Sequence, residues 1–170
     1  MVAYIDNLIH QIPFHLYFVA AIILCLGVFA FIKWEGIGKG IRYSASLILA
    51  EYIVLLYCST ILYRETKDVR KYDFHPFWSY NNPGLYDENI MNVVVFVPIG
   101  LLLGASIKDL KWWYALLIGF CLSSLIEILQ FVFKKGFSET DDVMHNTLGC
   151  LIGFGFYSLI ELSTRLRKTE

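Results

Sequence analysis

Five apolar stretches, each near the length of a membrane-crossing helix, constrain the fold of this 170-residue chain more than any other feature. About 20 helical residues cross a hydrocarbon core of about 30 Å. Only 17% of the residues are charged and 57% are hydrophobic, which excludes an ordinary soluble domain. The sequence predicts an all-α polytopic membrane protein, a bundle of about five transmembrane helices that cover about 13–32, 43–63, 90–107, 112–133 and 143–162.

The whole chain, residues 1–170, is interpreted as a single transmembrane domain. No Lys or Arg precedes the first apolar stretch and Pro13 opens it, a pattern that favours a retained anchor over a cleaved signal peptide. The formal net charge of −1 gives no basic field for nucleic acid. The four cysteines lie singly in different apolar stretches, without CxxC spacing. We therefore expect membrane lipids as surroundings, no nucleic acid, no metal and no cofactor, and the sequence permits an oligomer.

Basic residues near the ends of the spans indicate the orientation in the membrane. With five spans, eight Lys and Arg residues lie on the side of the C-terminus and six lie on the other side. The stretch before the first span has none, whereas Lys33, Lys39 and Arg42 follow that span. We therefore expect a plasma-membrane protein with its N-terminus outside and its C-terminus in the cytoplasm.

Polar residues in or beside the spans mark candidate functional positions, because such groups are costly in lipid. In the expected orientation, the end of the second span, the start of the third, the end of the fourth and the start of the fifth meet at the outer face. Glu127 and Gln130 share one helix face, since they are three residues apart. The ligand-binding candidates at this outer face are Arg64, Asn92, Glu127, Gln130, Asp141, Asp142 and Asn146.

One stripe of the fifth span changes from polar to small residues. Asp142, Asn146, Gly149 and Gly153 recur at intervals of four, three and four residues, which places them on one helix face. The two glycines allow another helix to approach closely. The candidate helix-packing residues are Gly149 and Gly153 on this span and Gly100 and Gly104 on the third.

Structural roles are open for several of the same residues. Asp141 or Asp142 could cap the fifth span, where a carboxylate meets the free amides of the first turn. Asn146 and Gln130 could form hydrogen bonds between helices. Glu51, near the middle of the second span, is interpreted either as a buried hydrogen-bonding group or as a proton relay.

Enzyme motifs receive little support from the sequence. The glycine-rich segment 35–40 resembles a phosphate-binding loop, but it joins two spans and follows no strand. Asp141, Asp142 and His145 carry oxygen and nitrogen ligands for a cation, at a spacing that is common by chance. A catalytic residue therefore stays unassigned, with Glu127 and Asp142 as the candidates.

The long loop at 64–89 is rich in aromatic residues and contains Pro76 and Pro83. Aromatic side chains favour the headgroup level of a membrane, because one end of each ring system is apolar and the other is wet. We expect this loop either to cover the outer-face site as a lid or to form an interfacial belt.

Three spaced motifs run through the last three spans: Asn92-x5-Pro98-x-Gly100, Glu127-x2-Gln130 and Asp141-Asp142-x3-Asn146-x2-Gly149-x3-Gly153. Together these motifs resemble the pattern of the VanZ-like membrane family over about residues 43–160. Arg64 at the end of the second span and the Pro76-Phe77 pair in the loop add to the similarity, whereas His145 replaces a hydrophobic residue of the family.

The resemblance implies a small multi-pass protein that is linked, in the name-giving member, to resistance to teicoplanin, a lipoglycopeptide that acts at the cell surface. It implies no settled reaction. We therefore expect envelope protection by an outer-face polar site that contacts the lipoglycopeptide or a lipid-linked wall precursor. The alternative is an intramembrane enzyme for a lipid-linked envelope substrate, with Glu127 as base or acid, Asp142 orienting it and Arg64 holding a phosphate. A transporter is a third hypothesis.

Overall fold

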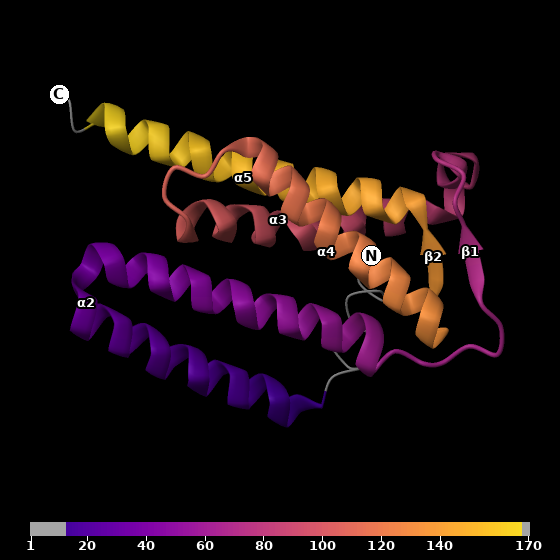
Figure 1. Cartoon of the computed structure of the whole chain (residues 1–170), viewed down its shortest axis with the longest axis horizontal. Helices are drawn as coiled ribbons and strands as arrows, with labels where there is room; N and C mark the ends of the chain where they lie inside the picture. The colour runs from indigo at the N-terminus through magenta and orange to yellow at the C-terminus, as the bar shows by residue number, and fades with distance from the viewer. Residues whose placement is uncertain (1–12, 168–170) are drawn as a thin grey trace.

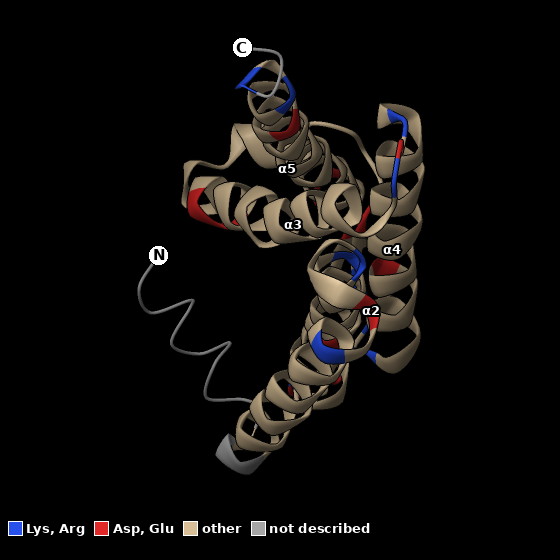
Figure 2. Cartoon of the chain, turned by 90° about the vertical axis from the view of Figure 1, so that its left-hand side faces the viewer, with Lys and Arg blue, Asp and Glu red and all other residues tan. Residues whose placement is uncertain are grey.

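The computed structural model describes residues 13–167 and is almost entirely helical. Figure 1 shows the long helices lying side by side, and in the end-on view of Figure 2 most of the ribbon carries no charged residue. The long helices are α2 (Phe14–Tyr57), α3 (Tyr86–Ser106), α4 (Trp112–Phe133) and α5 (Thr140–Arg167). The shorter elements are a π-helical turn η1 (Cys58–Leu62), the 3-10 turns η2 (Trp78–Asn81) and η3 (Pro83–Leu85), and the strands β1 (Lys71–Asp73) and β2 (Phe137–Glu139).

Helix α2 folds back on itself at Gly36, so it forms a hairpin of two antiparallel arms (Figure 1). Gly36 has φ 75° and ψ 170°, a left-handed conformation that a residue with a Cβ adopts only with strain. A straight helix of 44 residues would be about 66 Å long, twice the thickness of a hydrocarbon core. The first two expected spans are thus two arms joined by a tight turn, and not helices separated by residues 33–42.

Four helical stretches of the described chain are long and apolar enough to cross a membrane. The first of them, Leu16–Leu62, contains both arms of the hairpin, so a bundle of four to five membrane-spanning helices fits the structure. Large apolar side chains face outward along these stretches, for example Phe29 at 67% exposure and Leu159 at 64%. Such surfaces would be unfavourable in water and are favourable in lipid, which makes the protein a multi-pass membrane protein.

Two short strands gather at one end of the bundle, here called the strand end. This end also holds the start of α3, the end of α4 and the start of α5 (Figure 1). Strand β1 pairs with β2 in parallel, with Lys71 opposite Phe137 and Asp73 opposite Glu139. The pairing joins the aromatic loop to the α4–α5 connection. This pairing is not among the features predicted from the sequence.

Helices α3 and α5 approach so closely that their backbones touch at glycines. A Cβ on Gly149 or Gly153 would overlap with the backbone of Val93 or Val97 on α3. In the other direction, a Cβ on Gly100 would overlap with the backbone of Cys150. Gly104 lies against the ring of Tyr157. Both candidate glycine pairs therefore lie in one interface, facing each other's helix.

The core beside this interface is apolar and small. Cys150 of α5 is fully buried, and its Sγ lies 3.3 Å from the carbonyl oxygen of Ala115 on α4. All four cysteines are free thiols. The buried cluster consists of Leu56, Phe96, Ile99, Leu103, Ala115, Ile126 and Cys150.

Replacing Gly149 by Ala is expected to destabilise the bundle by about 1–3 kcal/mol, the usual effect of overpacking a close-packed interior. The added methyl group would overlap with the carbonyl of Val93 and push α3 away from α5. Thermal unfolding in detergent, followed by tryptophan fluorescence, measures the effect. Gly155→Ala is the matched control, because nothing lies within 4 Å of a Cβ there. Equal melting temperatures for the two variants would contradict the close approach.

Candidate functional site

A cavity of about 560 Å³ opens at the strand end, between the end of α2, the start of α3, the end of α4 and the start of α5. Its size lies within the range of small-molecule sites. Its walls combine apolar side chains of the spans with charged side chains, which come both from the spans and from the connecting segments. The lining residues are Leu56, Thr60, Arg64, Lys67, Lys71, Leu85, Glu88, Asn92, Val95, Phe96, Ile126, Glu127, Gln130, Gly136, Phe137, Glu139, Asp142 and Asn146.

Six of the seven ligand-binding candidates line this cavity. Arg64 follows η1, and the other five candidates come from α3, α4 and α5, so segments far apart in the sequence supply one site. Asp141 is the seventh candidate, and it does not line the cavity. The geometric convergence that the sequence suggested is therefore present for Arg64, Asn92, Glu127, Gln130, Asp142 and Asn146.

Glu127 is buried at 6% exposure, and one backbone donor holds one of its carboxylate oxygens. Its Oε2 accepts a hydrogen bond of 2.9 Å from the backbone N–H of Glu139. The Ser138 hydroxyl donates to the backbone carbonyl of Glu127 at 3.1 Å. Strand β2 is thus fastened to α4 at this carboxylate, which fixes the direction in which the side chain of Glu127 points.

Asp142 lies across the cavity from α3 and is held by it. Asn92 donates from Nδ2 to Asp142 Oδ1 at 2.6 Å. One turn further along α5, Asn146 donates to the hydroxyl of Ser123 on α4 at 2.8 Å. The polar stripe of α5 therefore makes one hydrogen bond to each neighbouring helix, and this supports the interhelical role that the sequence left open for Asn146.

Gln130 differs from its neighbours in the cavity. Its side chain is 4% exposed and lines the cavity, yet it forms no side-chain hydrogen bond with any residue in the described range 13–167. Its backbone carbonyl ends α4 by accepting hydrogen bonds from Lys134 and Lys135. The side-chain amide of Gln130 therefore borders the cavity without a hydrogen-bond partner among the described residues.

Three cations border the same cavity: Arg64, Lys67 and Lys71. Gly136 makes room for the first of them, because a Cβ there would lie 2.9 Å from the guanidinium carbon of Arg64. The backbone carbonyl of Arg64 accepts a hydrogen bond of 2.8 Å from Lys135 Nζ. The α4–α5 connection therefore positions Arg64 in two ways. Lys135 binds the backbone carbonyl of Arg64, and Gly136, which has no side chain, leaves space for the guanidinium group.

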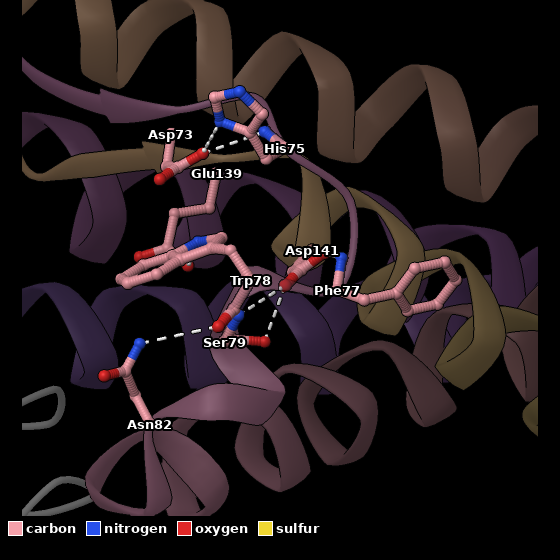
Figure 3. Close-up of polar contacts among 8 residues, drawn as sticks. All are labelled: Asp73, His75, Phe77, Trp78, Ser79, Asn82, Glu139 and Asp141. Carbon is pink, nitrogen blue, oxygen red and sulfur yellow. Dashed lines mark hydrogen bonds and ion pairs between the residues drawn. The ribbon is translucent and has the colours of Figure 1, made fainter.

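Asp141 fastens the aromatic loop instead of lining the cavity (Figure 3). Its two carboxylate oxygens accept hydrogen bonds from the backbone N–H of Phe77 at 2.6 Å and of Ser79 at 2.9 Å, and from the Ser79 hydroxyl at 2.6 Å. Phe77 has φ 66°, a strained left-handed conformation for a residue with a Cβ. The buried carboxylate thus holds a strained loop, and its oxygens cap loop amides instead of the first turn of α5.

The proposed cation ligands Asp141, Asp142 and His145 have separate partners. His145 Nε2 lies 2.8 Å from the hydroxyl of Tyr80, whereas Asp142 faces Asn92 and Asp141 faces the loop. Among residues 13–167, no group of three or more His, Cys, Asp and Glu side chains is arranged to hold a metal ion. These three residues therefore form no shared coordination sphere.

Glu51 lies away from this cavity. It lines a separate apolar groove of about 310 Å³ that also includes Leu16, Val19 and Ile23 of the first arm of α2. Its Oε1 is buried and has no hydrogen-bond partner among the described side chains. The structural hydrogen bond suggested for Glu51 therefore has no partner in the described part of the chain.

Glu139 is a site residue that the sequence analysis missed. Its Oε2 accepts a hydrogen bond of 3.1 Å from Trp78 Nε1, and its N–H donates to Glu127. Burial raises the pKa of Glu139 from 4.5 to about 7, and nearby carboxylates, of which Glu88 is the strongest, act in the same direction. The hydrogen bond from Trp78 opposes this increase in pKa.

Lys67, Lys71 and Glu88 were also missed as site residues. Each lies in or next to a polar connecting segment, where charged residues are ordinary and give no signal. The parallel pairing of β1 with β2 brings Lys71 and Glu139 to the cavity.

Comparison with known proteins gives two matches. The model of the family described as VanZ/LLP1 matches residues 19–161. The chain is also similar to the protein named Protein VanZ from Enterococcus faecium, with 30% identity over 130 residues that cover 72% of this chain and 79% of the relative. No solved structure matches the chain at a significant level.

The raised pKa of Glu139 predicts a pH-dependent stability. The carboxyl group of Glu139 has a pKa of about 7 in the folded protein and of 4.5 in the unfolded chain. Between these two pH values the folded state binds more protons than the unfolded state, so the free energy of unfolding decreases as the pH rises from 4.5 to about 7. We expect the melting temperature of the wild type to fall relative to that of Glu139→Gln across this interval. The glutamine mimics the protonated form, so a difference that stays constant from pH 4 to 8 would contradict the assignment.

Proposed function

Because the chain belongs to the VanZ/LLP1 family, we propose that it is an envelope-protecting membrane protein that confers tolerance to teicoplanin-type lipoglycopeptides. The cavity at the strand end would be its binding site, for the antibiotic or for a lipid-linked wall precursor. The observation that carries the proposal is the amphipathic lining, with Leu56, Phe96 and Ile126 at the apolar part and Arg64 and Glu127 at the polar part.

An amphipathic cavity suits a ligand that has a hydrocarbon chain and a polar group. The apolar side chains come from membrane-spanning segments, whereas the basic residues come from the segment that follows the second crossing. Burial of a chain against the apolar part stabilises binding by about 25 cal/mol per Å² of apolar surface. Hydrogen bonds from a polar group to the charged part supply orientation and specificity.

The proposal also requires that the strand end faces outward. Support comes from the distribution of Lys and Arg, of which eight lie on the side of the C-terminus and six on the side of the strand end. The first connection alone contributes Lys33, Lys39 and Arg42 to the inner side. The N-terminus would then be outside and the C-terminus in the cytoplasm.

Cysteine accessibility in intact cells tests this orientation. Glu65→Cys lies at the strand end and Lys111→Cys in the connection between α3 and α4, and both native side chains are exposed. We expect a membrane-impermeant maleimide to label the first variant and to leave the second unlabelled until the membrane is opened. The unmodified protein measures the background from its own four cysteines. The reverse labelling pattern would exclude a cell-surface site.

An intramembrane enzyme for a lipid-linked envelope substrate is the second candidate. The observation that favours it is the fixed position of the buried Glu127 beside Asp142, with the guanidinium of Arg64 in the same cavity. In such an enzyme Glu127 would act as the general acid or base, and Arg64 would hold a phosphate. General acid–base catalysis contributes about 10²–10⁴-fold to a rate, which makes the two candidates separable by one substitution.

Expression in a susceptible Gram-positive host, with titration of teicoplanin and vancomycin, tests the protective role. We expect the wild type to raise tolerance to teicoplanin several-fold over empty vector, with a smaller effect on vancomycin. The double variant Glu127→Gln/Asp142→Asn should lose this tolerance at equal membrane level, because it removes two of the carboxyl groups that line the cavity. No difference between wild type and empty vector would exclude the protective role and favour the enzyme.

The matched control is Glu65→Gln/Asp68→Asn, which removes two carboxylates from the same end of the bundle but from positions that do not line the cavity. It should protect as well as the wild type. The single variant Glu127→Gln then separates the candidates. A binding site keeps part of its function, since glutamine still accepts a hydrogen bond from the N–H of Glu139, whereas an acid–base enzyme loses nearly all of it.

A further inference from the structure

The charges in the cavity are of both signs, and they do not neutralise one another directly. Three cations and four carboxylates line it: Arg64, Lys67, Lys71, Glu88, Glu127, Glu139 and Asp142. Among residues 13–167, the ion pairs within 4.0 Å involve other side chains, and none joins a cation of this cavity to a carboxylate. The cations and the carboxyl groups of the cavity are thus not in direct contact.

The carboxylates have hydrogen-bonding capacity left for a ligand. Asp142 gives one oxygen to Asn92, and Glu139 gives one oxygen to Trp78. The second oxygen of each has no protein donor among the described residues. The side-chain amide of Gln130, 4% exposed, adds a donor and an acceptor with no protein partner in the same range. Groups that are held in place but incompletely paired are typical of a site that is completed by its ligand.

We propose that this cavity binds a zwitterionic phospholipid, whose headgroup carries a phosphate for the cations and a primary ammonium for the carboxylates. The inference rests on the proposed function for the location of the ligand site, and it names a membrane phospholipid as the occupant in place of the antibiotic or wall precursor. Arg64, Lys67 and Lys71 hold the phosphate, and Asp142 and Glu139 accept hydrogen bonds from the ammonium. The hydrocarbon chain lies against the apolar wall.

Charge complementarity selects this class over lipids with one charge. A lipid that carries only a phosphate offers no N–H donor to the free carboxyl oxygens of Asp142 and Glu139, and one that carries only an ammonium meets three cations. Repulsion of this kind disfavours the wrong ligand as strongly as attraction favours the right one. A primary ammonium also offers N–H donors to the unpaired carboxylate oxygens, which a quaternary ammonium lacks.

The full chain in a neutral detergent, titrated with single-chain lipids and read by native mass spectrometry, tests the proposal. The probes are lysophosphatidylethanolamine, lysophosphatidic acid, lysophosphatidylcholine and an alkylamine, all of equal chain length. We expect lysophosphatidylethanolamine to bind at least about tenfold more tightly than the others, the effect of losing one charge-assisted hydrogen bond. Free phosphoethanolamine should compete only weakly, because it lacks the chain that the apolar wall binds.

Substitutions of the two charge signs should have different effects on the probes. Lys67→Gln and Lys71→Gln should weaken all three phosphate-bearing probes. Asp142→Asn and Glu88→Gln should weaken lysophosphatidylethanolamine about tenfold and strengthen lysophosphatidic acid, because they remove attraction to the ammonium and repulsion of the phosphate. Glu88 is exposed at the start of α3, so its variant tests the same point without a buried change.

Lys134→Gln and Glu65→Gln are the matched controls, since both residues lie near the strand end without lining the cavity. They should leave all four affinities unchanged. Equal binding of all lipids, or a preference for lysophosphatidic acid that the acidic variants do not alter, would overturn the zwitterionic assignment. Tight competition by free phosphoethanolamine would also overturn the assignment, because it would show that the cavity binds the headgroup without the hydrocarbon chain.

The two levels of the hypothesis fail separately. Loss of teicoplanin tolerance in Glu127→Gln/Asp142→Asn, together with no preference among the lipids, would overturn the lipid inference and retain the proposed protective function. A lipid preference that follows the charged residues, in a chain that gives no tolerance to teicoplanin, would retain the lipid site and overturn the protective function.

Discussion

The close approach of α3 and α5 is the constraint on which the rest of the structure depends. Helices that touch through backbone atoms at Gly100, Gly149 and Gly153 fix both the spacing and the register of their polar ends. That register brings Asn92 to Asp142 within 2.6 Å. Because the driving force for helix association in lipid is packing and not hydrophobicity, the glycines are as important for the site as the polar side chains that line it.

Local patterns in the sequence were sufficient for the spans, for the glycine stripe and for the convergence of six polar residues. They rest on apolar run length and helical periodicity, which are properties of neighbouring residues. The function of Asp141 could not be predicted in this way. An Asp at the start of a helix looks the same whether it caps that helix or accepts from Phe77 and Ser79, more than 60 positions earlier. The pairing of Lys71 with Phe137 is likewise non-local.

The aromatic loop is coupled to the cavity by a short series of hydrogen bonds. Trp78 donates to Glu139, and the backbone of Glu139 donates to Glu127. Within the loop, Phe74 and Phe77 are more than half exposed, whereas Ser79 is fully buried against Asp141. A change in the charge of Glu139 acts on the tryptophan of the loop and on the position of a cavity carboxylate together. The lid and the interfacial belt both stay predictions for this loop.

A site of mixed charge at the edge of a membrane is favourable only under particular conditions. Buried charges without partners are costly, yet charges that face one another across a water-accessible cavity keep part of their hydration. Glu51 shows the contrast, since its unpartnered oxygen lies in an apolar groove within the first helical hairpin, without an opposing cation in that groove. The cavity at the strand end retains seven charged side chains because connecting segments supply most of its cations and β2 supplies one carboxylate. A ligand with matching charges would displace water from the cavity and replace the hydration of these groups by contacts with the ligand. The selectivity for a ligand then depends on how the positive and negative groups of the cavity are arranged and not on the net charge of the cavity.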